Sequence, residues 1–305
     1  MYASIESRLP TAPPGRSGWP WTEGLTLASG SSASRCPRIS VVMPSLNQGA
    51  FVEEALRSVL LQDYPDVELI VVDGGSTDGS VEAIRKYSPH LARCISERDR
   101  GPAHALNKGF RFATGEILGF LNADDLLLPG SLMKIAREFR ARPAADVVSG
   151  HGYLANAAGE IGAPFISDRW NLHRFANDAC VLVQAATFFR RDLFNQIDGF
   201  NERNRTAWDM ELWADLALAG ARFHTFDEFL AVSRLHHASI TCRLELRRQR
   251  RQDARAVRQK VKGRIETSGD RFYAILERVR KFSGHPLRTL NQRLFFYSTL
   301  HRWSV

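Results

Sequence analysis

The chain lacks the cysteine spacing, the long apolar runs and the leader pattern that identify several large classes of protein. Its cysteines form no CxxC pair, which argues against a zinc site and favours a reducing compartment. They are Cys36, Cys94, Cys180 and Cys242. No apolar run approaches the about 20 residues that a membrane-spanning helix needs. Residues 1–35 show no basic-then-apolar signal pattern. We therefore expect a cytoplasmic protein.

No internal repeat is visible, and the glycine-rich loop at 74–79 does not fit GxGxxG, so a dinucleotide site is not indicated. The 305 residues suffice for one large α/β domain, or for one domain with appendages. The apolar content of 44% and the charged content of 24% are ordinary for a globular protein. Residues 1–36 are rich in Ser, Pro and Gly and predict a poorly ordered lead-in.

The formal charge of +8 is unevenly distributed. Residues 243–305 hold 17 Lys and Arg against 5 Asp and Glu, whereas the rest of the chain holds 24 against 28. The basicity is therefore a property of the C-terminal tail. The charge break near Cys242 predicts a catalytic domain at 37–242 and a basic helical tail at 243–305.

Strand-like and helix-like segments alternate along the first half of the chain. Short apolar runs ended by polar or Gly-rich loops predict strands at 39–44, 67–73, 91–96, 117–121 and 146–149. Helical spacing predicts helices at 51–60, 81–87, 103–113 and 131–140. This alternation predicts βαβ units and a mostly parallel sheet. Right-handed crossovers then bring the loops 45–49, 73–79 and 122–125 to one crevice.

The second half is less regular. A strand is predicted at 181–190, a helix at 208–219 that ends at Gly220, and a strand at 229–235. Beyond residue 242 a basic helical region follows.

Adjacent acids follow the apolar run that ends at Leu121. Asp124 and Asp125 would repel each other unless a cation or a donor compensated them. Oxygen ligands of this kind suit Mg²⁺ or Mn²⁺ holding a diphosphate. The alternative is a turn or helix cap ahead of Pro129. This stretch alone leaves both interpretations open.

Three further segments each allow a functional and a structural interpretation. Asp73 ends a strand and could accept a bond from a nucleobase or a ribose, or it could form an Asx turn. Asp209 and Glu211 face different ways on a helix, and Asp209 could be a general base or a capping residue. Asp209 lies in the first turn of this predicted helix, where the helix dipole is expected to favour its ionised carboxylate. A histidine pair behind Arg234 could contact phosphate or metal, or could be structural.

In their order along the chain, these motifs resemble family 2 inverting glycosyltransferases with the GT-A fold, from about Pro37 to Thr241. Pro44-Ser-Leu-Asn-Gln-Gly49 is similar to the opening nucleotide loop, although Leu46 replaces a common aromatic. Val72-Asp-Gly-Gly-Ser-Thr-Asp78 resembles the segment whose first Asp holds the base. The resemblance implies donor-binding roles for Pro44, Ser45, Asn47, Asp73, Gly75, Asp99, Asn107, Lys108, Asn122 and Ala123. His104 replaces an acid that is frequent in this subgroup.

The same resemblance implies the remaining roles. Leu121-Asn-Ala-Asp-Asp125 is similar to the metal-binding DxD region, and because Asn122 replaces its first acid, Asp124 is the main ligand with Asp125 in support. Asp209 matches the catalytic base. The acceptor side is implied for Gln184, Trp208 and Glu211, and the diphosphate for Arg234, His236 and Ser239, with His236 also near the metal.

The function implied is transfer of a sugar, with inversion, from a UDP- or dTDP-sugar to a hydroxyl of a glycan or lipid-linked acceptor. The implied cofactor is Mn²⁺ or Mg²⁺. A sugar nucleotidyltransferase would be expected to carry an Arg in its first loop, and residues 45–49 hold no Arg or Lys. A non-catalytic glycan-binding module would be expected to lack the base or the metal acid, and both Asp209 and Asp124 are present.

The basic tail supports a separate hypothesis. Phe272, Ile275, Leu276, Val279 and Phe282 share one helical face near several arginines, and aromatic residues follow at 295–297 and 303. A basic amphipathic helix of this kind suits an anionic membrane surface, which would make the protein peripheral on the inner face of the cell membrane. The alternative is a helix that packs on the catalytic domain. No nucleic-acid partner is expected, because no recognised binding module accompanies the charge.

Overall fold

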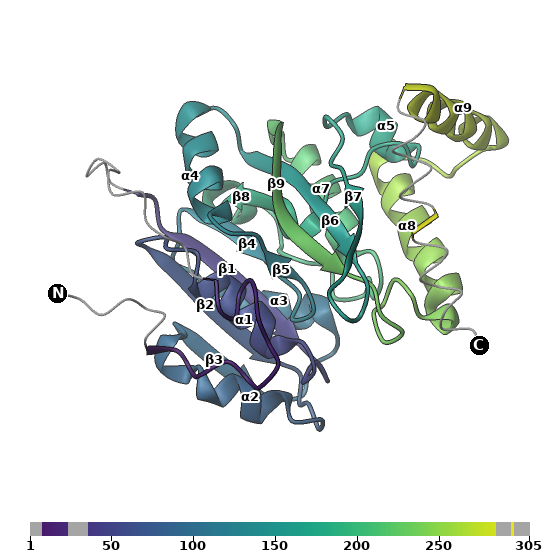
Figure 1. Ribbon diagram of the computed structural model, residues 1–305. Coiled ribbons are helices and arrows are strands. Elements are labelled where there is room, and N and C mark those ends of the chain that lie inside the picture. The colour runs from purple at the N-terminus through teal and green to yellow at the C-terminus, as the bar shows by residue number, and fades with distance from the viewer. Residues whose placement is uncertain (1–7, 24–35, 285–293, 296–305) are drawn as a thin grey trace. The chain divides into compact units, whose positions relative to one another are not determined.

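The computed structural model describes residues 8–23, 36–284 and 294–295 (Figure 1). The aromatic residues Phe296, Tyr297 and Trp303 of the expected tail lie outside the described residues. The chain forms two compact units. Unit 1 comprises Met1–Ala144 and Phe188–Asp192, and unit 2 comprises Ala145–Thr187 and Leu193–Val305. Each unit is described by itself.

Unit 1 is built on a mostly parallel sheet in the order β3-β2-β1-β4-β8. Its strands are β1 (Ile39–Ser45), β2 (Val67–Asp73), β3 (Arg93–Ser96), β4 (Ile117–Phe120) and β8 (Thr187–Arg190). The pairs β1–β2, β1–β4 and β2–β3 are parallel, whereas β8 joins β4 antiparallel. β1 is buried at every position, as its apolar run predicted. The expected parallel sheet is confirmed.

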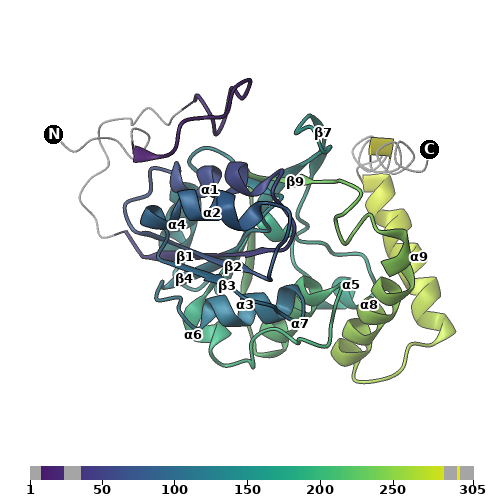
Figure 2. The ribbon, with the colours of Figure 1, turned by 90° about the horizontal axis from the view of Figure 1, so that it is seen from below.

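Helices cover both faces of this sheet. They are α1 (Val52–Leu60), α2 (Ser80–Lys86), α3 (Pro102–Phe110) and α4 (Ser131–Ala141), together with a short 3₁₀ turn η2 (Ser88–His90) and the two-residue strand β5 (Leu126–Leu127). Figure 2 shows α1, α2 and α4 on one face and α3 on the other. Gly109 of α3 lies against Val42 and Val72 so closely that a Cβ would stand 2.4 Å from Val42 Cγ1. The close approach seats α3 on β1 and β2.

Part of the N-terminal segment packs on α1, in contrast to the expected poorly ordered lead-in. The Arg57 guanidinium is buried and donates to the carbonyl oxygens of Pro10, Pro20 and Trp21. It also lies 5.3 Å from the ring centre of Trp21, which is itself buried. Because the buried guanidinium of Arg57 donates to these backbone carbonyls, it fixes residues 8–23 against α1.

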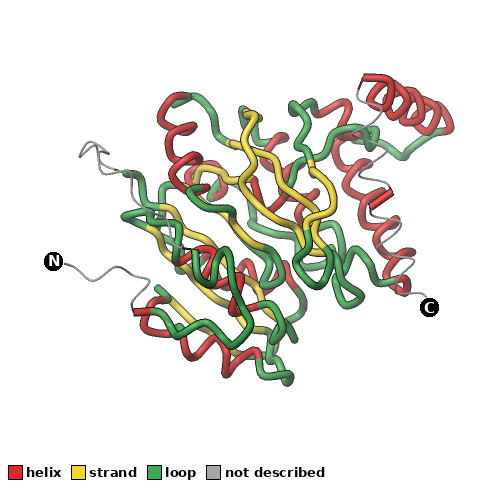
Figure 3. Tube along the Cα trace, in the orientation of Figure 1, coloured by secondary structure: helices red, strands yellow, loops and turns green. Residues whose placement is uncertain are grey.

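Unit 2 combines a small sheet with a helical group. Its elements are β6 (Val147–Ala155), β7 (Ile161–Phe165), β9 (Phe223–Arg234), α5 (Leu172–Ala176), η3 (Gln184–Ala186), α7 (Trp208–Leu218), η4 (Leu244–Leu246), α8 (Arg247–Lys262) and α9 (Ser268–Gly284), with α6 (Arg191–Phe194) after β8. β6 pairs antiparallel with β7 and parallel with β9, and Figure 3 shows these strands side by side. Phe175, Ala214 and Val257 from α5, α7 and α8 share one buried cluster. The first helix beyond the charge break therefore packs into unit 2.

One predicted strand is shorter in the structure. Residues 181–190 were expected to be extended throughout, but a 3₁₀ turn occupies Gln184–Ala186 and the strand starts only at Thr187. The Thr187 hydroxyl donates to the Val183 carbonyl at 2.7 Å, which stabilises this turn. Among the described residues, no helix is long and apolar enough to cross a membrane.

Candidate functional site

The strand order of unit 1 places a switch point at the carboxyl end of β1. β2 and β3 lie on one side of β1, and β4 lies on the other. Open parallel sheets bind ligands outside the carboxyl ends of the strands at such a point. Ser45 ends β1 opposite Asp73, and the acid cluster follows β4. The structure therefore brings the predicted donor loops to one edge of the sheet.

The loops after β1 and β2 are joined by a network of hydrogen bonds. The backbone N–H of Asn47 donates to Ser76 Oγ at 2.8 Å. The side-chain oxygen of Asn47 accepts from the Thr77 N–H at 2.9 Å. The Gly49 N–H donates to the Asp78 carboxylate at 2.8 Å. Asn47 has φ of 52°, a left-handed conformation in which Asn is several-fold enriched over other residues. The two loops form one preorganised unit.

Asp73 is fully buried and its carboxylate holds the loop that follows it. It accepts from the N–H groups of Gly75 and Ser76, each at 3.0 Å, and from the hydroxyls of Ser76 and Ser96. The Asx-turn interpretation is thus realised in the structure. These N–H and hydroxyl groups engage both carboxylate oxygens, so Asp73 directly fixes the conformation of the loop at 74–79.

Ser45 has a feature that the sequence did not reveal. Its side-chain oxygen is buried, and within the described part of the chain it has no hydrogen-bond partner. A buried hydroxyl without a partner is costly, so its retention at the switch point calls for an explanation. A bound ligand would supply the missing partner. Pro44, one residue earlier, pairs with Val72 and lies within β1.

The next stretch of the predicted donor site, residues 96–109, packs against the loop that follows β2. The Asp99 carboxylate accepts from the Gly101 N–H at 2.7 Å and lies against Gly74, where a Cβ would stand 2.4 Å from Asp99 Oδ2. Gly75 has φ of 89°, which favours glycine. Lys108 contacts Glu97 at 2.8 Å, and hydrogen bonding from Lys108 lowers the pKa of Glu97.

α3 carries two other residues of this stretch. His104 Nδ1 accepts from the Arg100 N–H at 3.1 Å, so this ring, whose role the sequence left undefined, ties the loop to α3. Asn107 is half-buried on the same helix.

The acid cluster after β4 fits a shared metal site better than a closed protein cage. Asp124 and Asp125 are both buried, Ala123 lies buried beside them, and Asn122 donates to Asp125 Oδ2 at 3.2 Å. No group of three or more His, Cys, Asp or Glu side chains suited to a metal ion occurs among the described residues. Mg²⁺ usually takes one or two carboxylates and completes its shell with water and substrate phosphates. The pair meets that requirement.

Asp209 is half-buried in the first turn of α7. Enclosure by the surrounding protein raises its pKa above 3.8, and bonds from the backbone N–H groups of Met210 and Asp209 only partly oppose this. The sequence predicted that the helix dipole would favour the ionised form. The structure differs because desolvation outweighs the local donors. A raised pKa makes the carboxylate a stronger base.

Glu211 and Trp208, predicted on the acceptor side, are held by protein partners. Glu211 is buried and accepts from Asn201, Asn204 and Lys260, the last at 3.1 Å. Burial alone would raise the pKa of Glu211, but these donors lower it overall. Trp208 is buried and packs edge-to-face on Phe200. Both residues therefore stabilise the fold around α7.

Gln184 is half-buried at the start of η3.

The segment predicted to contact the diphosphate, residues 234–239, is ordered by a turn of its own. Arg234 is buried and donates to the Ala157 carbonyl at 3.1 Å, in the turn between β6 and β7. His236 is buried, and its carbonyl accepts from the Ser239 hydroxyl at 2.7 Å. The turn thus follows directly from the end of β9.

Asp253 of α8 fixes the chain just ahead of α7, a contact that sequence reasoning missed. It accepts from the N–H groups of Arg205 and Thr206 at 3.1 Å and from the Thr206 hydroxyl at 2.6 Å. Lys260, two turns further along α8, pairs with Glu211 and Asp215 of α7. Partners this far apart in sequence leave no local signal.

Replacing Asp253 with Ala should destabilise the protein, because the donors of Arg205 and Thr206 would lose their acceptor. We expect a loss of about 1–3 kcal/mol. The midpoint of thermal unfolding should fall by about 2–4 °C for each of these kcal/mol. Gln252→Ala, an exposed change on the same helix, is the control and should leave the midpoint unchanged. Equal melting of the two variants would contradict the assigned role.

Comparison with known proteins agrees with this geometry. The profile of the family described as Glycosyl transferase family 2 matches residues 40–197. The chain is 34% identical over 182 residues to a PGL/p-HBAD biosynthesis glycosyltransferase of Mycobacterium tuberculosis, covering 58% of this chain and 69% of the relative. It is 28% identical over 218 residues to an uncharacterized glycosyltransferase of Nostoc sp., covering 66% of each. The chain thus spans about two thirds of the length of these relatives.

A solved structure shares the fold. The mannosyltransferase PcManGT from Pyrobaculum calidifontis, in complex with GDP-Man and Mn²⁺, aligns with a TM-score of 0.58 at 22% identity. The alignment covers 88% of this chain and 84% of that chain. This likeness confirms the predicted α/β fold.

Proposed function

Because the chain belongs to glycosyl transferase family 2, we propose that it is an inverting transferase. It moves a sugar from a nucleoside-diphosphate donor to a hydroxyl of a glycan or lipid-linked acceptor. One observation carries this proposal: among the described residues, the buried hydroxyl of Ser45 at the switch point of unit 1 has no hydrogen-bond partner. Ser45 ends β1, which pairs with β4, and the acid cluster follows β4. The GDP-Man complex of the Pyrobaculum calidifontis neighbour supports a nucleotide-sugar donor.

The proposed base is Asp209. Its carboxylate takes the proton of the acceptor hydroxyl as that oxygen attacks the anomeric carbon. The bond from this carbon to the diphosphate oxygen breaks, and the nucleoside diphosphate leaves with the electron pair. The raised pKa of Asp209 suits this role, because a base works best when its pKa approaches the working pH. Displacement in one step inverts the anomeric configuration.

The donor is proposed to bind along the carboxyl edge of the unit 1 sheet. Ser45 and Asn47 contact the nucleotide, and Asp73 acts on it through the loop that it holds. Asp99, Asn107 and Lys108 border the same edge. Arg234, His236 and Ser239 are proposed to contact the diphosphate.

A divalent cation fits Asp124, with Asp125 in support. When bound, Mn²⁺ or Mg²⁺ would neutralise charge on the departing diphosphate. The buried, adjacent carboxylates support this, since a cation would compensate the repulsion between them, which the bond from Asn122 to Asp125 relieves only in part. The Mn²⁺ complex of the Pyrobaculum calidifontis neighbour supports the cation as well. Participation of His236 remains a prediction.

We place the reaction in the cytoplasm. The thiols of Cys36, Cys94, Cys180 and Cys242 are all free, which supports a reducing compartment.

Product analysis with a panel of UDP-, dTDP- and GDP-sugars tests the proposal. We expect one donor to yield a glycoside and its nucleoside diphosphate in equal amounts. Release of pyrophosphate would instead indicate a nucleotidyltransferase. A bound donor that is never consumed would indicate a non-catalytic module. Donors are first selected by thermal shift with Mn²⁺, because a ligand that binds the folded state stabilises it.

A further inference from the structure

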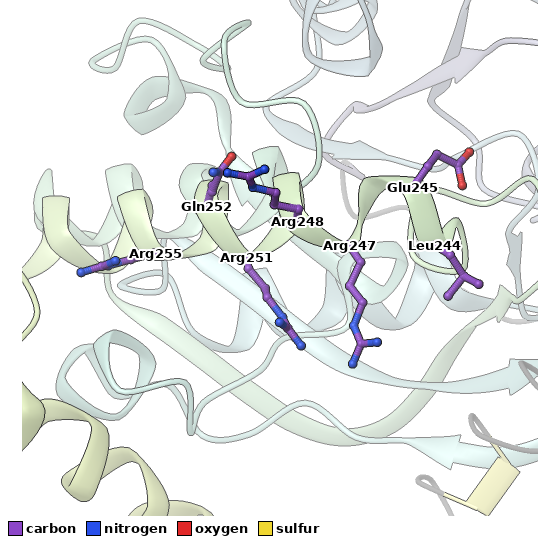
Figure 4. Close-up of a pocket in the computed structure, with 7 residues that line it drawn as sticks. All are labelled: Leu244, Glu245, Arg247, Arg248, Arg251, Gln252 and Arg255. Carbon is purple, nitrogen blue, oxygen red and sulfur yellow. The ribbon is translucent and has the colours of Figure 1, made fainter.

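The outer face of α8 is a row of arginines. Arg247, Arg248, Arg251 and Arg255 are exposed on consecutive turns, as Figure 4 shows. Among the described residues, no acid pairs with Arg247, Arg248 or Arg251. By contrast, Lys260 and Lys262 on the same helix have acidic partners. Arg255 pairs with Glu266 at 3.6 Å. The uncompensated part of the row is therefore Arg247, Arg248 and Arg251.

The arginines also act on one another. The pKa of Arg250 is lowered, chiefly by burial, and the charges of Arg247 and Arg251 contribute to this shift. Like charges held at this spacing cost stability unless an anion lies over them. The buried residues of α8 are Asp253 and Val257, which form its inward face.

α9 presents its apolar stripe outward, the reverse of an ordinary surface helix. Phe272, Ile275, Leu276 and Val279 follow the i, i+3, i+4, i+7 spacing and are 65%, 57%, 44% and 58% exposed. A surface helix normally turns such a stripe toward the core. Here α9 is attached through other residues. Glu277 pairs with Arg174 at 3.4 Å, and Tyr273 packs edge-on against His173.

The cationic row and the apolar stripe meet in one groove. Arg251, Arg255 and Arg258 of α8 line it together with Ala274 and Ile275 of α9. The acids Asp178, Glu266 and Asp270 also line this groove, whereas the uncompensated Arg247 and Arg248 lie on the outer side of α8 and not inside the groove. Figure 1 shows the two helices at one end of unit 2. Exposed apolar side chains also stand beyond the ends of α8, at Leu244 and Ile265. Charge and apolar area are thus presented on a continuous surface.

We propose that the outer faces of α8 and α9 form one membrane-docking surface that binds anionic phospholipid. The arginines contact headgroup phosphates, and the α9 stripe enters the boundary between headgroups and acyl chains. A second copy of the chain fits less well, because a two-fold contact through this face would oppose arginine rows. An acidic glycan or a nucleic acid would leave the apolar stripe uncovered.

Docking on a bilayer goes beyond the proposed transfer reaction and is measured without substrate. If it fails, product analysis still decides the chemistry. The experiment uses the full chain, because truncation at Cys242 would remove Asp253 and Lys260 and so disturb α7.

The test is flotation with vesicles of phosphatidylglycerol and phosphatidylcholine in equal parts, and with vesicles of phosphatidylcholine alone. We expect binding to the anionic vesicles only, weakening as salt is added. Ile275→Glu should abolish flotation. Arg248→Glu with Arg251→Glu should also abolish it, since each lost basic residue alone weakens binding by about fivefold.

Two matched controls carry the same chemical changes elsewhere. Ile161→Glu replaces an apolar residue of β7 that is 56% exposed, and Arg137→Glu replaces an exposed arginine of α4. Both should float like the wild type. Equal binding to neutral vesicles, or wild-type flotation of Ile275→Glu, would overturn the proposal.

Competing partners give different results. Self-association that Ile275→Glu abolishes, with no vesicle binding, would assign the face to a second copy and reject the membrane. Retention on heparin that needs the arginines but not Ile275, again without vesicle binding, would assign it to a polyanion and reject the membrane equally.

Discussion

Asp209→Asn should lose turnover by about 10²–10⁴-fold, the usual contribution of a positioned general base. The same variant should bind the donor normally and unfold at a higher temperature than the wild type at neutral pH. The two effects share one cause. Enclosure disfavours the ionised carboxylate in the folded state, and that ionised carboxylate is the form that accepts the proton. Function is therefore expected to cost stability at this position.

The sign of the stability effect follows from linkage. The pKa of Asp209 is raised in the folded state, so its contribution to stability is fully present below the unfolded value of about 3.8 and is lost as pH rises through the folded pKa. The difference in unfolding temperature between the Asn variant and the wild type should therefore narrow as pH falls toward 3.8. The rate of sugar transfer by the wild type should decline over the same range of falling pH, because the base becomes protonated.

Glu211→Gln is the matched control on the same helix. The pKa of Glu211 is lowered by bonds from Asn204, Asn201 and Lys260, so its ionised form stabilises the fold above the unfolded pKa. The Gln variant should melt lower at neutral pH, the opposite of Asp209→Asn. Calorimetry and steady-state rates measure both effects. Near-normal turnover by Asp209→Asn would refute the base assignment, whatever its melting temperature.

Strands and loops that depend on local pattern were predictable. Val67–Asp73 was expected as a strand and is observed with the same bounds, because a buried parallel strand requires a continuous apolar run. The meeting of the loops at Asn47 and Ser76 followed from parallel topology. β7 left no such signal. Its residues, Ile161–Phe165, include glycine and proline and are partly exposed, so no alternation identifies them.

Roles that depend on tertiary enclosure were not predictable. The pKa of Asp209 follows from how much protein surrounds it, which no local pattern reports. That Ser45 Oγ has no hydrogen-bond partner among the described residues can be recognised only once its spatial neighbours are known. Glu211 and Lys260 could not be paired from sequence, because complementary charges occur throughout the chain.

Asp124→Asn should remove the Mn²⁺ dependence of donor binding and lower turnover by at least about 10²-fold, since a metal Lewis acid contributes several kcal/mol. EDTA should abolish transfer by the wild type, and added Mn²⁺ should restore it. A readout without turnover is available, because free Mn²⁺ loses its electron paramagnetic resonance signal on binding. Asp125→Asn should show a smaller defect, because Asp125 already accepts a bond from Asn122. Unchanged Mn²⁺ binding by Asp124→Asn, or transfer insensitive to chelation, would contradict the metal site.

Asn122→Asp tests the same site from the opposite direction. The substitution adds a carboxylate where Asn122 now donates to Asp125, so it exchanges a hydrogen bond for a repulsion. Without metal the variant should therefore melt below the wild type. Because a bound cation would compensate the added charge, Mn²⁺ with a nucleoside diphosphate should raise its melting temperature by more than it raises that of the wild type. An equal rise in the two proteins would mean that no cation lies between these side chains and the diphosphate.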